Sequence, residues 1–254
     1  MKNKKLYIII MSFVSIIIIT YSLSLSKTEA PLLSEEIETK WKTELTDNDK
    51  YVVIGRSTIA PKNILNKSKV VLLTIDDGPS IRTREMVRIL NTHNVKAIFF
   101  INGIHDKDNQ GIIQQLEEEG FAIGNHTWSH INLKKEKDTN IIEKEINDNT
   151  NLIIKLTNNY PRFFRAPFGE SNTYIRKLAK DQGMIFMDWS GSALDWDKST
   201  KEKDIFISNV MSNVHSGSII LIHEHPWSVA NLDALLTTLE IAGYTYVDPR
   251  NIIE

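Results

Sequence analysis

Two adjacent carboxylates, Asp76 and Asp77, stand at the end of the first clear strand in this 254-residue sequence. They belong to the segment Thr74-Ile-Asp-Asp-Gly-Pro79, which follows the apolar run Val70 to Leu73. At a strand-to-loop exit the chain bends, so two neighbouring side chains can line one cavity. Two carboxylates this close resist being ionised together unless a cation lies between them. The pair therefore calls for a metal ion, a basic partner, or both.

Two histidines offer ligands for such a cation. In the segment His126-Thr-Trp-Ser-His130 the imidazoles are four positions apart, which on a helical turn places both on one face. Together with one carboxylate of the aspartate pair they give two histidines and one aspartate, the ligand pattern of catalytic zinc sites. Taken alone, the two histidines are equally compatible with a helix cap or a surface pair.

Three more ionisable residues follow other predicted strands: Arg165, Asp195 and His223. A guanidinium near the aspartate pair would keep one carboxylate ionised, although the usual fate of an arginine is a surface ion pair. Asp195 offers a carboxylate and His223 a group that titrates near neutral pH. With these residues the sequence has both proton acceptors and proton donors near the predicted metal ligands.

Several residues near these motifs fit structural roles. Trp196, directly after Asp195, is by itself more typical of core packing. Glu224 and His225, which follow His223, are expected to be solvated. The remaining histidines are predicted to be structural or to lie at the surface: His93, His105 and His215.

The apolar pattern predicts strands that alternate with helices. The strands are expected at 70–75, 96–101, 121–124, 162–165, 184–187, 218–222 and 244–247, and the helices at 80–93, 108–119, 139–158, 172–182, 202–214 and 229–242. Such alternation indicates a parallel sheet. A closed or nearly closed barrel is favoured over a doubly wound open sheet, and periodicity does not separate the two. In a barrel of this type reactive groups gather at the carboxyl ends of the strands, where the ionisable residues above fall.

Composition excludes several kinds of site. The net charge of −2 gives no basic field for nucleic acid. The chain has no cysteine, so disulfides, thiolate zinc sites and a cysteine nucleophile are excluded. No Gly-x-Ser-x-Gly elbow and no His-Glu-x-x-His motif occurs.

The N-terminus has the pattern of an export signal. Lys2, Lys4 and Lys5 precede an uncharged, mostly apolar run from Leu6 to Ser26, long enough to cross a bilayer with the basic end inside. Residues 1–30 are therefore predicted to be a membrane anchor or a cleaved signal peptide, with Thr28-Glu29-Ala30 as a weak cleavage site. Residues 31–65 are predicted to form a leader or stalk, and residues 66–254 an extracytoplasmic domain.

Taken together, the motifs resemble those of the polysaccharide deacetylases, the NodB-homology domain of carbohydrate esterase family 4. The resemblance covers about Val70 to Val247. It is carried, in chain order, by Thr74-Ile-Asp-Asp-Gly-Pro79, Ala97-Ile-Phe-Phe-Ile-Asn-Gly103, Gly124-Asn-His-Thr-Trp-Ser-His130, Arg165-Ala-Pro-Phe-Gly169, Asp195-Trp196 and Leu221-Ile-His223.

The resemblance implies a distorted (β/α) barrel of about seven parallel strands and metal-dependent removal of acetyl groups from an N-acetylated glycan. It also implies a role for each matching residue. The metal ligands would be Asp77, His126 and His130, and zinc would be the common metal, with cobalt as an alternative. Asp76 would be the general base held by Arg165, and His223 the general acid oriented by Asp195. Phe168 would offer a backbone N–H, Trp196 a wall of the sugar groove, and Leu221 a lining for the acetyl methyl.

Three positions depart from the family's pattern. Phe168 stands where tyrosine is frequent, Glu224 where an aspartate usually follows the catalytic histidine, and Ser192 where many members have another aspartate. A backbone role survives the change at Phe168. The other two departures could alter substrate choice or the tuning of His223.

Three functional hypotheses are compatible with these motifs. The leading one is deacetylation of N-acetylglucosamine in peptidoglycan. The second keeps the reaction and changes the substrate to chitin oligomers, poly-N-acetylglucosamine, muramic acid residues or O-acetylated xylan. The third is an inactive glycan-binding envelope protein, which the complete set of base, ligands and acid argues against.

Overall fold

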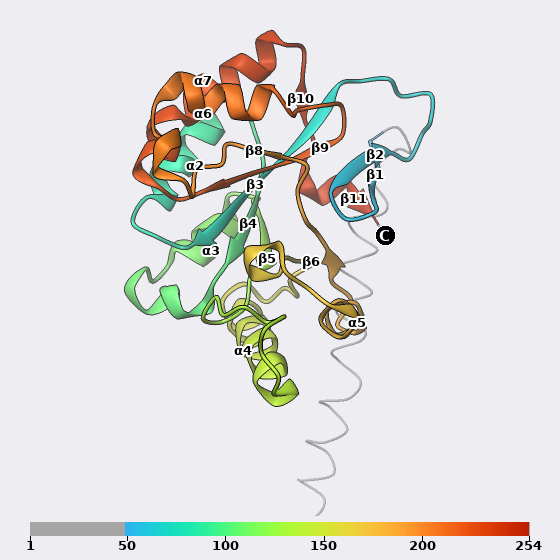
Figure 1. Cartoon of the computed structure of the whole chain (residues 1–254), viewed down its shortest axis with the longest axis vertical. Coiled ribbons are helices and arrows are strands. Elements are labelled where there is room, and N and C mark those ends of the chain that lie inside the picture. The colour runs from blue at the N-terminus through green and yellow to red at the C-terminus, as the bar shows by residue number, and fades with distance from the viewer. Residues whose placement is uncertain (1–48, 254) are drawn as a thin grey trace, which may run out of the picture. The chain divides into compact units, whose positions relative to one another are not determined.

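A sheet of parallel strands forms the centre of the fold, which the computed structural model describes over residues 49–253. Strand β3 (Val70–Gly78) lies between β9 (Ser218–His223) and β4 (Ile98–Ile101). Beyond β4 the sheet continues through β5 (Ala122–Asn125), β6 (Phe163–Phe164) and β7 (Ile185–Phe186). Strand β8 (Gly191–Ser192) pairs with β9, and β10 (Thr245–Tyr246) pairs with the start of β3. All these pairings are parallel, so the carboxyl ends of the strands share one edge (Figure 1).

The strands from β3 to β9 form the predicted distorted barrel, and the α/β fold is confirmed. Between residues 49 and 253 no strand pairing joins β7 to β8, so the barrel is open there. The predicted strand at 244–247 is only the two-residue β10. Strand β8 was not predicted, because a Gly-Ser pair carries no apolar pattern.

A hairpin that precedes the predicted domain extends the sheet beyond β9. Strands β1 (Tyr51–Ile54) and β2 (Thr58–Pro61) pair with each other in antiparallel fashion, and Thr58 of β2 pairs with Ser218 of β9. Strand β11 (Ile252–Ile253) runs parallel to β1 (Figure 1). Residues 51–61 therefore belong to the sheet and not to the leader, and the predicted domain boundary at residue 66 is too late. Residues 31–48 of the predicted leader and the predicted anchor or signal peptide lie outside the described residues.

Helices connect most of the parallel strands. They are α2 (Thr83–Thr92), α3 (Ile112–Glu118), α4 (Thr139–Thr157), α5 (Thr173–Asp181), α6 (Lys203–Met211) and α7 (Pro226–Ile241), with short 3-10 turns η1 (Gly103–Asp108), η2 (Pro167–Gly169), η3 (Lys198–Thr200) and η4 (Pro249–Asn251). Helix α4 shows why the sequence forms them: Asp138 caps its first turn, Ile142 and Ile146 face the core, and Asn158 ends it in a left-handed conformation. The predicted helix at 108–119 is split, because Gly111 adopts a φ of 79° before α3.

The core lies on both faces of the sheet. Alternate residues of β3 point to opposite sides: Val71 and Leu73 pack beneath the helices, whereas Val70 and Leu72 join a second cluster inside the barrel. Because both faces of this strand are covered, its sequence is a continuous apolar run and not an alternating one. The buried strands give the site a rigid base.

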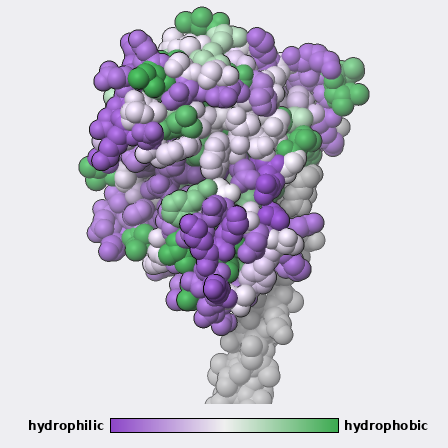
Figure 2. Space-filling view, in the orientation of Figure 1, coloured by the Kyte–Doolittle hydropathy of each residue, from purple (hydrophilic) through white to green (hydrophobic). Residues whose placement is uncertain are grey.

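Outside the core the surface is mixed. Figure 2 shows polar residues over much of the visible face, with apolar residues scattered among them. Across residues 49–253 no helix is both long enough and apolar enough to cross a membrane. The apolar run Leu6 to Ser26 is not among these residues.

Candidate active site and metal centre

The three predicted metal ligands converge at the carboxyl edge of the sheet. Asp77 lies at the end of β3, and His126 and His130 lie in the loop after β5. Their ligand atoms are all within 4.8 Å of one another. Asp77 Oδ1 is 3.5 Å from Nε2 of His126 and 3.3 Å from Nε2 of His130. One cation could therefore contact all three side chains.

The loop that holds the histidines is not the helical turn assumed from their spacing. Thr127 and His130 both have left-handed backbones, with φ values of 71° and 59°, and this folds the two imidazoles toward each other. Asp77, at φ 68°, has the same unusual backbone. Non-glycine residues in this region cost free energy and cluster at functional sites, which is consistent with a backbone bent to bring these ligands together.

Buried asparagines fix this loop, and the sequence analysis did not identify them. Asn125 Oδ1 accepts hydrogen bonds from the Thr127 N–H at 2.8 Å and from Asn149 Nδ2 at 3.0 Å. Asn102 Nδ2 donates to the carbonyl oxygen of His126 at 2.5 Å. All three asparagines are buried. Asn102 and Asn125 do fall within segments that carry the family resemblance, so their presence there was the available signal.

The chemistry of the donor set fits a divalent cation. Asp77 Oδ1 is buried and has no hydrogen-bond partner, which is costly unless a cation supplies the missing interaction. The Nδ1 of His126 is 2.7 Å from the carbonyl oxygen of Arg165; it therefore carries the proton and leaves Nε2 as a ligand. Burial lowers the pKa of His130 and favours its neutral, ligating form. Burial would raise the pKa of Asp77, but His126, His223 and His130 lower it below its usual value.

Asp76 lies beside the ligands and is held by a buried arginine. Its Oδ1 pairs with Nη1 of Arg165 at 2.7 Å, and its Oδ2 is 3.6 Å from Nε2 of His126. Arg165 also donates to Thr74 Oγ1 and to the carbonyl oxygens of residues 187 and 188. The guanidinium is fully buried, with the Phe100 ring 4.2 Å away. Arg165 is thus not a surface ion-pair residue, and it leaves Asp76 Oδ2 free to face the site.

His223 and Asp195 form a second hydrogen-bonded pair at the same edge of the sheet, on β9 next to Asp76. Asp195 Oδ1 lies 2.8 Å from Nδ1 of His223, while Oδ2 accepts hydrogen bonds from the His223 N–H at 2.7 Å and from Ser228. Burial alone would lower the pKa of His223, but the hydrogen bond and charge of Asp195, with further charge from Asp76 and Asp77, raise it to about 9. The imidazole is therefore protonated near neutral pH, and Nε2 remains available as a proton donor.

Two exposed aromatic rings flank the ionisable residues. The ring of Phe168, in η2, is 4.7 Å from His130 and is 62% exposed. The ring of Trp196 is 5.8 Å from His223 and is 50% exposed, so it is not a core residue. Leu221 is buried on β9, and its predicted contact with the acetyl methyl stays a prediction. Each ring offers exposed apolar surface next to one histidine of the ionisable cluster.

The two departures beyond Phe168 are found in different surroundings. Ser192 lies in β8, where its Oγ accepts a hydrogen bond from the Leu194 N–H at 3.0 Å. Glu224 is 6% exposed, so the expectation that it is solvated is wrong. The start of α2 and the loop before it cover its carboxylate, a contact between segments far apart in sequence.

The remaining histidines differ from one another. His225 is half-buried and stacks on Trp227 with 4.6 Å between ring centroids, so the expectation that it is solvated is also wrong. His93 is structural, because it bridges α2 to two acidic residues of α7. His215 is exposed, as predicted.

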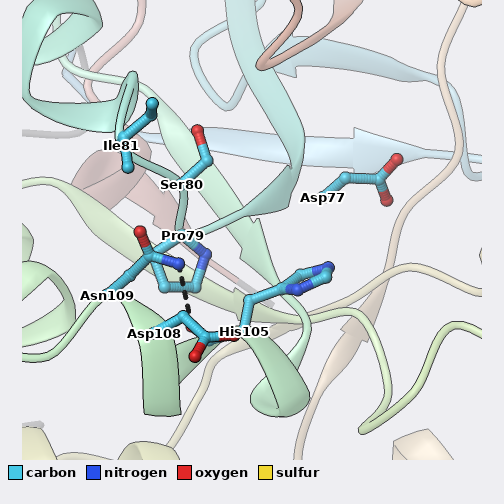
Figure 3. A pocket seen from close by; sticks show the side chains of 7 residues that line it. All are labelled: Asp77, Pro79, Ser80, Ile81, His105, Asp108 and Asn109. Atoms are coloured by element: carbon cyan, nitrogen blue, oxygen red, sulfur yellow. Dashed lines mark hydrogen bonds between the residues drawn. The ribbon is translucent and has the colours of Figure 1, made fainter.

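His105 lies closer to the site than the sequence indicated. A pocket that begins at Asp77 runs between the loop after β3 and η1, and His105 borders it (Figure 3). Its lining residues are Asp77, Pro79, Ser80, Ile81, His105, Asp108 and Asn109. The sequence predicted a structural or surface role for His105, but η1 begins two residues after the end of β4 and so returns the side chain to the same edge.

Fold and site together define a class of protein: an α/β barrel whose carboxyl edge brings three residues able to hold a divalent cation next to a buried carboxylate and a histidine. A model of the polysaccharide deacetylase family matches residues 64–187. A peptidoglycan-N-acetylglucosamine deacetylase of Bacillus cereus is 34% identical over 188 residues, which cover 72% of this chain and 67% of that protein. The chain belongs to the polysaccharide deacetylase family, and the predicted family and enzyme class are confirmed.

Other relatives support the same membership and show its range. The deacetylase PgdA of Listeria monocytogenes is 33% identical over 74% of this chain, but the matched part spans only 39% of its length. A solved peptidoglycan N-acetylglucosamine deacetylase, in complex with an N-oxidanyl benzamide, is 32% identical, with a TM-score of 0.66 and coverage of 71% of this chain and 86% of that one. A CE4 family pseudoenzyme from Bacillus anthracis has the same TM-score at 29% identity, covering 71% of this chain and 63% of that one. The fold alone therefore does not establish catalysis, and the site residues must carry that argument.

Proposed function

We propose that this protein removes acetyl groups from N-acetylglucosamine residues of peptidoglycan, outside the cytoplasm, with a bound divalent metal, most simply zinc. The observation that carries the proposal is the buried Asp77 Oδ1, which has no hydrogen bond and lies between two histidines, at the strand edge where Asp76 and His223 are register partners. The names of the relatives supply the glycan, since several act on peptidoglycan.

Asp77, His126 and His130 would hold the metal ion. When bound, such an ion polarises the acetyl carbonyl and makes a coordinated water more acidic. The ligand set leaves the site open toward solvent on the side of the half-buried His130, where a substrate can approach. Catalytic zinc sites keep such an open position, whereas structural ones are closed.

Asp76 is the proposed general base. Its Oδ2 faces the ligands while Oδ1 is held by Arg165, so the carboxylate can accept the proton of the attacking water without turning. The water oxygen then bonds to the acetyl carbon. The backbone N–H of Phe168 is our candidate donor to the oxygen that becomes negative at this carbon.

His223 is the proposed general acid. An amine is a poor leaving group, so the carbon–nitrogen bond breaks only as the nitrogen receives a proton. His223 is protonated because Asp195 binds its Nδ1, and Nε2–H would donate that proton to the departing nitrogen. The products are acetate and a free amino sugar.

The aromatic rings would bind the sugar chain. Sugar rings present apolar C–H faces that pack against exposed aromatic side chains, and Trp196 and Phe168 offer such surfaces next to His223 and His130. The pocket between Ile81 and His105 continues from Asp77 and offers polar side chains for a neighbouring sugar. A polymer could therefore extend on both sides of the reacting residue.

The extracytoplasmic location rests on sequence alone. The basic start and the apolar run Leu6 to Ser26 would export the domain and could keep it at the outer face of the membrane. Fractionation of cells that express the full chain tests this: we expect the protein in the membrane or wall fraction and cleavable by external protease.

Acetate release across a panel of glycans tests the function. Full-length protein in mild detergent, stripped of metal and resupplied with Zn²⁺ or Co²⁺, is incubated with peptidoglycan, N-acetylglucosamine oligomers and O-acetylated xylan. We expect release from peptidoglycan that a chelator abolishes, with mass spectrometry locating the free amine on glucosamine. Release only from another glycan would reassign the substrate. No release from any of them would overturn the proposal in favour of a glycan-binding protein.

A further inference from the structure

Glu224 is a buried carboxylate that the proposed mechanism does not use. It directly follows His223 and is 6% exposed. Within residues 49–253 its carboxylate is hydrogen-bonded to Thr83 and forms no ion pair with a lysine or arginine. Burial raises the pKa of Glu224 to about 7, although neighbouring hydroxyl groups lower it. A buried acid without a basic partner is costly, so its presence beside the site calls for a role.

The carboxylate of Glu224 contacts the segment that leaves β3. Thr83 Oγ1 lies 2.8 Å from Oε1 and 2.7 Å from Oε2 of this carboxylate. Ser80 and Thr83 are themselves joined, because the Ser80 N–H donates to Thr83 Oγ1 at 2.8 Å. Glu224 therefore links the end of β9 to the first turn of α2 and to the loop before it.

Gly78 shows how closely Glu224 approaches this loop. A Cβ on Gly78 would lie 2.5 Å from Glu224 Oε1, closer than atoms can pack, so the carboxylate occupies the space where another residue would place its side chain. Gly78 is the residue after Asp77. Glu224 thus packs against the backbone immediately beyond the metal ligand.

Asp77 needs support from its surroundings. Its left-handed backbone and its buried oxygen without a hydrogen bond are both unfavourable. On the N-terminal side, β3 holds it through the pairing of Asp76 with His223. On the C-terminal side, Gly78 pairs with Ile101 of β4, and Glu224 contacts the segment from Gly78 to Thr83 from the end of β9.

We propose that Glu224 is a positioning residue: it braces the segment from Gly78 to Thr83 against the end of β9 and so fixes the carboxylate of Asp77 toward His126 and His130. The inference rests on the proposed function only in taking Asp77 as a metal ligand. Because Glu224 adjoins His223, the same brace ties the metal-binding side of the site to the strand that carries the proton donor.

Metal affinity tests the inference without depending on turnover. The full-length protein is compared with Glu224→Gln, which is nearly the same size, with Glu224→Asp, which keeps the charge but withdraws the carboxylate by one C–C bond, and with the exposed control Glu118→Gln. Competition with a chromophoric chelator gives the Kd for Co²⁺, and the Co²⁺ absorption spectrum reports ligand geometry. Thermal melting of the metal-free proteins measures stability separately.

We expect both Glu224 variants to bind Co²⁺ about tenfold more weakly, since residues that orient metal ligands commonly contribute 10- to 100-fold. The control should bind as the parent does, and the metal-free Tm values should stay together. Parent-like affinity and spectra in both Glu224 variants would overturn the inference, as would a lower Tm with unchanged affinity. A parent protein that binds Co²⁺ but releases no acetate would instead overturn the proposed function and leave this inference standing.

Discussion

The two residues proposed to move protons stand side by side but are held in opposite ways. Asp76 and His223 are register partners on β3 and β9. Asp76 is paired with the guanidinium of Arg165 at 2.7 Å, whereas His223 is paired with the carboxylate of Asp195 at 2.8 Å. Arg165 and Asp195 are both fully buried, and they lie in the loops that follow β6 and β8. The adjacent strands place Asp76 and His223 next to each other, and each buried partner gives its residue a neighbour of opposite charge.

This difference shows how one edge of the sheet can hold a proton acceptor and a proton donor at the same pH. When the environments of two titratable groups push their pKa values apart, one group can act as a base and the other as an acid. The buried carboxylate of Asp195 keeps a proton on His223, and the buried guanidinium of Arg165 gives Asp76 a cationic neighbour. The proton-transfer roles of Asp76 and His223 therefore depend on Arg165 and Asp195 as well as on the residues themselves. Changes to the two pairs should have separate effects.

Removal of a metal ligand should impair acetate release even with Asp76 and His223 intact. His126→Ala deletes the Nε2 next to Asp77, and we expect acetate release to fall about 10³-fold, roughly 4 kcal/mol of barrier. Metal binding should be lost as well, because only two ligands remain. Kinetics with resupplied zinc and metal analysis of the purified protein measure both effects. His215→Ala, at an exposed position, is the control; retained metal binding in His126→Ala would contradict the ligand assignment.

Neutralising the proposed base should lower activity but leave metal binding intact. Asp76→Asn keeps the size of the side chain but cannot accept the proton, so we expect kcat to fall ~10²- to 10⁴-fold while metal still binds. Because Arg165 loses its buried partner, the melting temperature should also fall. Asp181→Asn, which breaks an exposed pair with Lys177, is the matched control. A variant that lost metal together with activity would place Asp76 among the ligands.

The pH profile should reveal the partner of the acid. The raised pKa of His223 means that the donor is present below about pH 9 and is lost as pH rises through that value. In Asp195→Asn burial remains but the compensating charge is gone, so the alkaline limb of kcat/KM should move to lower pH. Activity at pH 8 should then fall more than at pH 6, and once the pKa lies below 8 the protonated fraction at pH 8 falls ~10-fold for each further pKa unit lost. An alkaline limb that did not move would show that Asp195 does not set this proton affinity.

Much of the site could be predicted because parallel strands share an edge. Asp76, Asp77, Arg165 and His223 each end or follow a strand, so chain order alone predicts that they meet. The burial of Glu224 could not be predicted in this way. Its partner Thr83 is 141 positions earlier, and nothing in the local sequence shows which loop will cover a residue.

Backbone geometry limited the prediction elsewhere. The left-handed conformations of Thr127 and His130 have no glycine to reveal them, so the loop was taken for a helical turn. Strand β8 has two residues, too few for a periodic pattern. The β1–β2 hairpin precedes the segment that carries the family resemblance, and only its pairing with β9 shows that it belongs to the sheet.

The smallest predicted effects concern the two exposed aromatic rings. Trp196 lies beside His223 and Phe168 beside His130. Since stacking of an exposed ring contributes about 0.5–1.5 kcal/mol, Trp196→Ala should raise KM for a glycan oligomer up to about tenfold and leave its pH profile unchanged. Phe168→Ala should have a similar effect and retain catalysis, because the role proposed for that residue belongs to its backbone. Kinetics on monomeric and oligomeric N-acetylglucosamine would separate binding from chemistry: a shifted alkaline limb in Trp196→Ala would mean that the ring acts on the proton donor, as Asp195 does, and not on the sugar.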